Sequence, residues 1–431
     1  MSTPATGIDS GLGLLRHKNF ALYLCARVVA TLGVQMQSVA IGWQVYALTG
    51  DLFDLGMIGL AQFAPFFLLV LPAGEVADRY DRRRIITACL ALQLVCALFL
   101  LTFSLTAQSV VWPVFAALTL FGTARAFMMP ASQAILINIV PAASFGPAVA
   151  LSSSTFHVAV ILGPVLGGFL YLGGPKLVYG VVAVLLAAGI VLMLLIQSAP
   201  VQSVQKRASL RTVLEGLQFV WSRPVVLGAI SLDLFAVLLG GAVALLPAYA
   251  RDVLHTDTTG LGLLRSAPGA GAALTSILLA FHPLGRRVGL WMFGGVAVFG
   301  LATVALGYTS SLGVAMLALF LTGAGDMVSV YVRHILVQVE TPDAIRGRVS
   351  AVNAIFIGAS NELGEFESGV VAAWLGLVPA IVIGGVATLA VTIVWAWRFP
   401  VLRRMDRFPQ LEARGVPDAH SPVTSASVKP S

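Results

Sequence analysis

The chain has 431 residues, of which 58% are hydrophobic and only 10% are charged, and its net charge is +7. A soluble protein carries about 25% charged residues, so this composition excludes an ordinary water-soluble domain. Long apolar runs recur along the chain, and a run of about 20 residues spans a bilayer as a helix. The runs are continuous and do not alternate with polar residues, which also excludes a transmembrane β-barrel. We therefore expect an all-α membrane protein.

Twelve membrane-spanning helices are predicted, and one long connection divides them into two halves of six. The connection has an apolar helical face between Leu210 and Trp221, which is typical of a helix at the membrane surface. The tail is polar and rich in Ser, Pro and Ala, so we expect it to be disordered. The predicted spans are 20–46, 53–74, 85–105, 111–139, 148–171, 177–197, 225–249, 258–281, 288–308, 312–339, 350–374 and 377–397. The predicted organisation is an N-terminal segment at 1–19, a first half at 20–197, a linker at 198–224, a second half at 225–397 and a tail at 398–431.

The basic residues are divided unevenly between the two sides of the predicted bundle. Of the 26 Lys and Arg, twenty lie on the side of the two termini, and only Lys176 and Arg251 lie on the other side. Because Lys and Arg accumulate in cytoplasmic loops, we expect both termini in the cytoplasm and the protein in the cell inner membrane. The positive charge therefore orients the chain in the membrane, and we expect no nucleic-acid partner.

The loop "GEVADRYDRRR" at 74–84 places three acids and four arginines between two apolar runs. Its Gly74, Asp78, Arg79 and Arg82 resemble the signature loop between helices 2 and 3 of the major facilitator superfamily. The resemblance implies a conformational latch, in which Asp78 meets the start of the eleventh helix in the outward-open state. A carboxylate is favoured at a helix N-terminus, and the two arginines are expected to pair with acids at neighbouring helix ends. The alternative is that the arginines only fix the topology.

A second motif, Gly163-Pro164-x-x-Gly167-Gly168 in the fifth span, resembles the motif that marks exporters and antiporters of the same superfamily. Small residues allow helices in a membrane to approach closely. We therefore expect a tight contact between this motif and the small-residue stretch 266–273 of the eighth span.

Further stretches resemble one branch of the superfamily. Asp81, where the superfamily usually has glycine, and "NELGEFESG" at 361–369 are similar to the branch of the enterobactin exporter and related secretion effectors. The stretch 135–150 resembles 335–351, and each copy lies between the fourth and fifth spans of its half. A parallel repeat of two six-helix halves is the arrangement of the major facilitator fold. The resemblance covers 13–405 and implies that fold.

Ionisable residues within the predicted spans are candidates for the functional site, because at membrane depth they usually face a cavity or a partner. Glu362 and Glu365 share one helix face, and Arg125 is a candidate counter-charge for an acid of the opposite half. We expect Arg333, near the cytoplasmic end of its span, to snorkel towards water. For each residue the alternative is a structural ion pair between helices. The candidates for proton coupling or for lining a cavity are Asp233, Glu362, Glu365, Arg27, Arg125 and Asp326.

No sequence motif indicates catalysis. The chain has no GxxxxGK[ST] phosphate loop and no HExxH, CxxC or GxSxG motif, so we expect no catalytic residue, metal or cofactor. An ion gradient remains as the energy source, and the resemblance implies protons. The predicted function is a monomeric secondary transporter that exports small amphipathic molecules, siderophore-like or drug-like, by alternating access. Its partners are then the substrate, the coupling proton and the lipid bilayer. The alternatives are an importer or facilitator, and a membrane sensor without net transport.

Overall fold

The computed structural model describes residues 13–106, 110–141, 144–197, 210–342 and 345–409. All regular structure in these ranges is helical. The predicted N-terminal segment up to residue 12 and the tail from residue 410 lie outside them. The first half contains α1 (Lys18–Thr49), α2 (Leu52–Arg79), α3 (Arg82–Leu105), α4 (Trp112–Ile139), α5 (Phe145–Leu170) and α6 (Pro175–Leu194). After α7 (Leu210–Ser222) the second half contains α8 (Pro224–Gly240), α10 (Thr258–Phe281), α11 (Val288–Tyr308), α12 (Leu312–Glu340), α13 (Arg346–Leu375), α14 (Leu377–Arg398) and α15 (Pro400–Arg403).

The long helices form a multi-pass membrane protein. Within the described ranges, 11 helical segments are long and apolar enough to cross a membrane. The twelfth spanning helix is α13, whose 30 residues exceed the length of about 20 that a bilayer requires. Its acids Glu362, Glu365 and Glu367 lower its hydropathy. Composition alone therefore does not identify α13 as a membrane-spanning helix.

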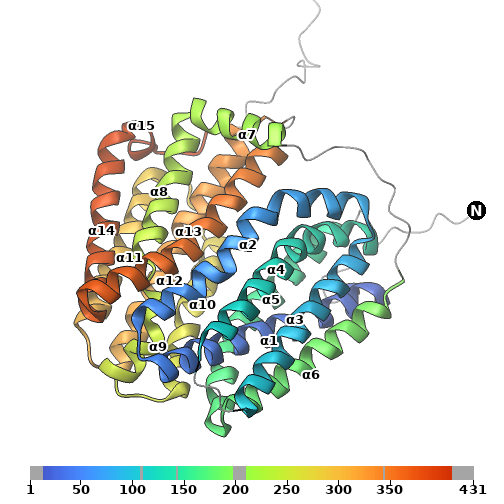
Figure 1. Cartoon of the computed structure of the whole chain (residues 1–431). Helices are drawn as coiled ribbons and strands as arrows, with labels where there is room; N and C mark the ends of the chain where they lie inside the picture. The colour runs from blue at the N-terminus through green and yellow to red at the C-terminus, as the bar shows by residue number, and fades with distance from the viewer. Residues whose placement is uncertain (1–12, 107–109, 142–143, 198–209, 343–344, 410–431) are drawn as a thin grey trace, which may run out of the picture.

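The two halves repeat one arrangement of six helices (Figure 1). In the first half α1 packs against α5 and α6, α2 against α4, and α3 against α4 and α6. In the second half α8 packs against α13 and α14, α10 against α12, and α11 against α12 and α14. The equivalent helices therefore follow the same order in the chain, as the major facilitator fold requires. Between the halves, α2 packs against α13, and α5 packs against α10. These two contacts are equivalent, because α10 is the second-half counterpart of α2 and α13 that of α5.

The seventh span is not a continuous helix to residue 249, contrary to the sequence prediction. α8 ends at Gly240, and the chain continues through a 3-10 turn (Ala242–Leu245), the short α9 (Leu246–Ala248) and a π-turn (Tyr249–Val253). Gly241 allows the backbone of α13 to approach, because a Cβ there would lie 3.1 Å from the carbonyl oxygen of Gly364. Proline at residue 247 has no N–H to donate to a helical carbonyl, so the sequence also disfavours a regular helix here.

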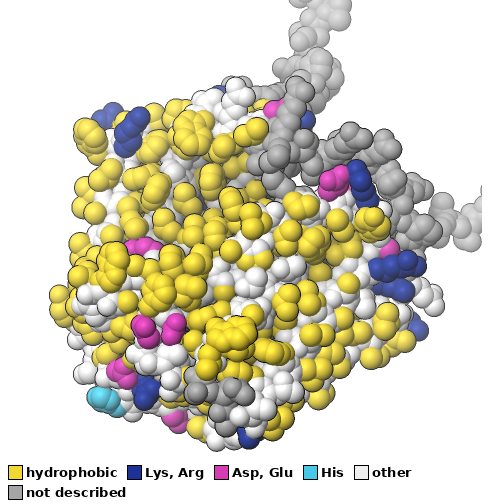
Figure 2. Space-filling view, in the orientation of Figure 1, with side chains coloured by type: hydrophobic (Ala, Val, Ile, Leu, Met, Phe, Trp, Pro, Cys, Tyr) yellow, Lys and Arg dark blue, Asp and Glu magenta, His cyan; other side chains and the backbone are white. Residues whose placement is uncertain are grey.

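The outside of the bundle is apolar, as lipid contact requires. Figure 2 shows hydrophobic side chains over most of the middle of one face. The aromatic side chains of Phe281, Trp374 and Trp397 are 78 to 81% exposed, which would be costly in water but is favourable against lipid.

The halves pack closely towards one end of the bundle. The end that carries α7 and α15, at the top of Figure 1, is called the linker face here, and the end with α9 the opposite face. Near the opposite face, a Cβ on Gly369 of α13 would lie 2.4 Å from the Cα atom of Gly56 in α2. Likewise, a Cβ on Gly168 of α5 would lie 2.2 Å from the carbonyl oxygen of Thr258 in α10. Glycine therefore allows the backbones of the two halves to touch.

We predict that Gly168→Val lowers the melting temperature of the detergent-purified protein. The added side chain has no space against Thr258, and overpacking a close contact costs about 1–3 kcal/mol. Gly180→Val in α6 is the matched control, since no atom lies within 4 Å of a Cβ at that position. Equal melting temperatures for the two variants would contradict this view of the α5–α10 contact.

Candidate functional site

An ion pair joins the two halves in the middle of the bundle. Arg125 of α4 contacts the carboxylate of Glu362 of α13, and the Glu362 side chain is only 5% exposed. The Arg125 guanidinium also lies over the ring of Phe66 in α2, 5.8 Å from its centroid. The opposite half therefore does bring an acid to Arg125. Since the pair links helices of different halves, any rocking of one half against the other must break or move it.

Glu365 lies one turn further along α13 and adds a second charge to the same interface. Its Cβ packs over Gly59 of α2, where an added Cβ would lie 2.7 Å away. Glu365 interacts electrostatically with Arg265 of α10 and with Arg125. Arg265 in turn donates a hydrogen bond of 2.6 Å to Ser38 of α1. Two acids of α13 and two arginines from different halves thus share one region.

Arg27 lies apart from these acids, inside the first half. It donates a hydrogen bond of 2.6 Å to the Ser152 hydroxyl of α5. Its guanidinium stands 5.2 Å from the ring centroid of Phe156. No ion pair of Arg27 with an acid is found among the described residues. In this conformation Arg27 therefore links α1 to α5.

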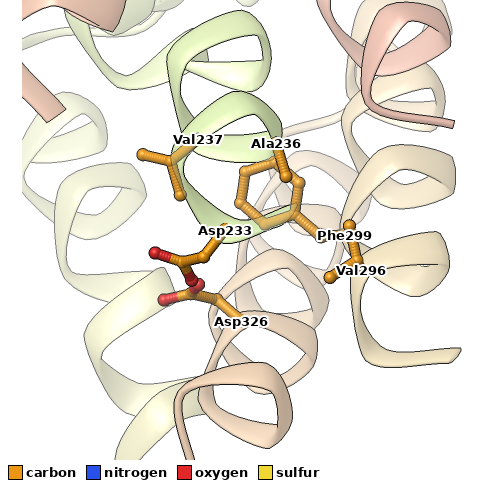
Figure 3. Close-up of a pocket in the computed structure, with 6 residues that line it drawn as sticks. All are labelled: Asp233, Ala236, Val237, Val296, Phe299 and Asp326. Atoms are coloured by element: carbon orange, nitrogen blue, oxygen red, sulfur yellow. The ribbon is translucent and has the colours of Figure 1, made fainter. Parts of the chain in front are cut away.

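Asp233 and Asp326 meet inside the second half and line a small pocket (Figure 3). Arg333 of α12 pairs with Asp233 of α8 at 2.9 Å, and its side chain is 2% exposed. The expectation that Arg333 snorkels towards water is therefore wrong. The reason is that α8 places an acid at the same depth, so that the charge is paired inside the bundle.

The latch residues lie at the linker face. Gly74 is half-buried in the last turns of α2, and Asp78 is exposed. Among the described residues no hydrogen bond or ion pair of Asp78 is found. Arg79 pairs with Glu75 of its own helix at 2.5 Å, and both side chains are exposed, so the pairing differs from the expected one with a neighbouring helix. Exposed pairs of this kind contribute little to stability.

Arg82 also differs from its expected pairing with an acid. It donates hydrogen bonds to the carbonyl oxygen of Ala134, at 3.2 Å, and to the side-chain oxygen of Asn138, at 3.0 Å. Both acceptors lie in the last two turns of α4, at the negative end of the helix dipole, which attracts cations. Arg82 therefore fixes the loop to the end of α4.

Gly163 and Gly167 of the fifth-span motif face α1 of the same half. A Cβ on Gly163 would lie 2.5 Å from the Gln35 Cβ, and one on Gly167 would lie 2.7 Å from the Met36 Cα. This side of the motif therefore allows α1 and α5 to pack closely within the first half.

The other side of the motif faces α10, as expected, but it contacts Thr258 and Gly262 at the start of that helix. Gly168 accepts a hydrogen bond of 2.9 Å from the Thr258 hydroxyl, and a Cβ on Gly262 would lie 2.5 Å from the carbonyl oxygen of Pro164. Within the expected partner stretch 266–273, Gly269 does face α5, since a Cβ there would lie 3.1 Å from the Ile161 side chain just before the motif, whereas Gly271 packs against the backbone of Phe320 in α12. The end of α5 meets the start of α10 because both lie at the opposite face.

Several polar partners were not identified from the sequence. The Tyr46 hydroxyl of α1 donates to Asp252 of the second half, and Asn353 of α13 accepts a bond of 3.3 Å from Arg333. A polar or charged residue beside apolar ones is a signal for such partners, but it does not say which helix they contact. Among the described residues, no group of three or more His, Cys, Asp or Glu could hold a metal ion.

Two halves of six equivalent helices, with paired charges between and within them, define a transporter of the major facilitator superfamily. Within that superfamily, the chain matches the transmembrane secretion effector family over residues 9–426 and belongs to it. It is 26% identical over 354 residues to the enterobactin exporter EntS of Citrobacter koseri, which covers 79% of this chain and 82% of that protein. It is 24% identical over 396 residues to an uncharacterized MFS-type transporter, YfiS, of Bacillus subtilis, with 88% and 92% covered. The fold resembles that of a POT family transporter crystallised with a thioalcohol-conjugated peptide, with a TM-score of 0.71, 12% identity, and 89% and 96% of the chains covered.

We predict that Asp78→Asn abolishes most transport while the protein still inserts into the membrane. The amide keeps the shape of the side chain and removes the charge that the start of α13 is expected to attract. Substrate flux in membrane vesicles, normalised to the amount of inserted protein, measures the effect. Glu75→Gln, which removes an acid one turn earlier on α2, is the control. Wild-type flux in well-inserted Asp78→Asn would contradict the latch.

Proposed function

We propose that the protein is a proton-driven exporter of small amphipathic molecules, located in the cell inner membrane with its linker face in the cytoplasm. The similarity to the enterobactin exporter EntS supports export and suggests a siderophore-like substrate. The observation that carries the proposal is the ion pair between Arg125 and Glu362. A charge pair across the interface of two repeated halves suits alternating access, because the pair is remade as the halves rock.

The polar contacts between the two halves are unevenly distributed along the bundle. With the linker face in the cytoplasm, this distribution supports an inward-facing state. Polar contacts join the halves at mid-depth and towards the opposite face, including Tyr46 with Asp252 and Thr258 with Gly168. At the linker face, Asp78 is exposed, which is the expected state of an open latch. A substrate would then enter from the cytoplasm.

Flux into membrane vesicles tests the direction of transport. With labelled enterobactin as the probe, we expect accumulation in everted vesicles with an acidic lumen, and none after a protonophore collapses the gradient. Vesicles from cells that lack the protein are the control. Accumulation in right-side-out vesicles only would indicate an importer, and accumulation in neither would favour a sensor; both results contradict the proposal.

The orientation gives a separate prediction. In a variant without Cys25, Cys89 and Cys96, we expect Ser222→Cys at the end of α7 to resist an impermeant thiol reagent in intact cells. It should react after the cells are permeabilised. Ser310→Cys, in the exposed turn before α12, is the control and should react in intact cells. The reverse pattern of labelling would overturn the orientation, because the linker face would then lie outside.

A further inference from the structure

The pocket in the second half has an unbalanced set of charges. Asp233 of α8 and Asp326 of α12 line it, and its other walls are the apolar side chains of Ala236, Val237, Val296 and Phe299. Figure 3 shows the two carboxyl groups lying towards each other. Two carboxylates that face each other in an apolar surrounding do not both ionise without a compensating charge.

Among the residues that the structure describes, Arg333 is the one cation that pairs with them. Arg333 pairs with Asp233 at 2.9 Å, and it also donates a hydrogen bond of 3.3 Å to the neutral side chain of Asn353. The neighbouring helices α11 and α14 contribute no charged side chain at this depth, since their only ionisable residues are Tyr308 and Arg398 at the helix ends. On α12, His334 follows Arg333 and is exposed. The pocket is therefore neutral only when one of its two carboxyl groups holds a proton.

We propose that Asp233 and Asp326 together form the site that binds the transported proton. This inference rests on the proton coupling in the proposed function and assigns it to one place. Of the acids at membrane depth, Glu362 has Arg125 as its own counter-charge, and Glu365 is influenced by both Arg265 and Arg125. The pocket pair differs from them because two acids share one arginine.

The assignment separates the proton from the path of the substrate. The pocket lies among α8, α11 and α12 of the second half, whereas Arg125 and Glu362 lie between the halves. The proton and the substrate therefore do not compete for one carboxylate, and coupling must pass through the protein.

Arg333 and α13 provide that connection. The Nε atom of Arg333 is buried and has no hydrogen-bond acceptor, so the guanidinium has a free donor for a second carboxylate. Loss of the proton makes Asp326 a competitor for Arg333, and this weakens the 3.3 Å bond to Asn353 on α13. α13 also carries Glu362, which holds the first half through Arg125. Protonation of the pocket thus changes how firmly α13 is held to the second half.

Infrared difference spectroscopy of the full chain in lipid nanodiscs tests the site directly, by following the C=O stretch of protonated carboxyl groups between acidic and alkaline buffer. We expect a titrating band in the wild type that is lost in both Asp326→Asn and Asp233→Asn. Each variant leaves one carboxylate with one arginine, which needs no proton. Glu367→Gln, an acid of α13 outside the pocket, is the matched control and should keep the band. An unchanged band in both aspartate variants would overturn the proposal.

Transport in everted vesicles gives the second readout, again with labelled enterobactin. Asp326→Asn should lose accumulation driven by a pH gradient but keep the exchange of labelled for unlabelled enterobactin without a gradient. Wild-type accumulation by Asp326→Asn would overturn the proposal. The infrared measurement needs no substrate, so it decides the proton site even if the wild type moves no enterobactin, a result that would overturn the proposed export alone.

Discussion

The absence of water in the bilayer core governs the whole structure, because each backbone group and each charge must find its partner inside the protein. Helices satisfy the backbone within each span, and the charges then require specific neighbours. Arg125 finds Glu362 in the other half, and Arg333 finds Asp233 in its own half. The exterior can consequently remain apolar, as Figure 2 shows. The charged residues in the spans thus fix how the helices are rotated and which helices meet.

Lipid removes the hydrophobic drive that joins helices in soluble proteins, so close packing of small residues takes its place. Gly168 and Gly369 allow backbone contact between the halves near the opposite face. Glycine contacts contain no interlocked side chains, and such an interface can open without many rotamer changes. The same residues therefore suit both a tight seal and a movement that breaks it.

α13 connects the parts of the molecule that transport would have to coordinate. Its middle contacts the first half through Glu362, and Asn353 contacts Arg333 beside the pocket. Near its start, Arg348 pairs with Glu215 of α7, the helix between the two halves. This one helix has the lowest apolar content of the twelve spanning helices because its polar side chains serve contacts in three directions. Its composition is thus a consequence of its position between the interface and the pocket.

The sequence by itself determined the spanning helices and the repeat of two halves, because the length and apolarity of a span are local properties. It singled out the charged residues at membrane depth, since each is a local exception in an apolar run. Only the tertiary structure decided their partners, the register between α5 and α10, and the end of α8 at Gly240. These features depend on the rotation and depth of helices that are distant in the chain. Arg333 was misjudged for this reason: its distance from the end of α12 is visible in the sequence, whereas the depth of Asp233 on α8 relative to it is set by packing.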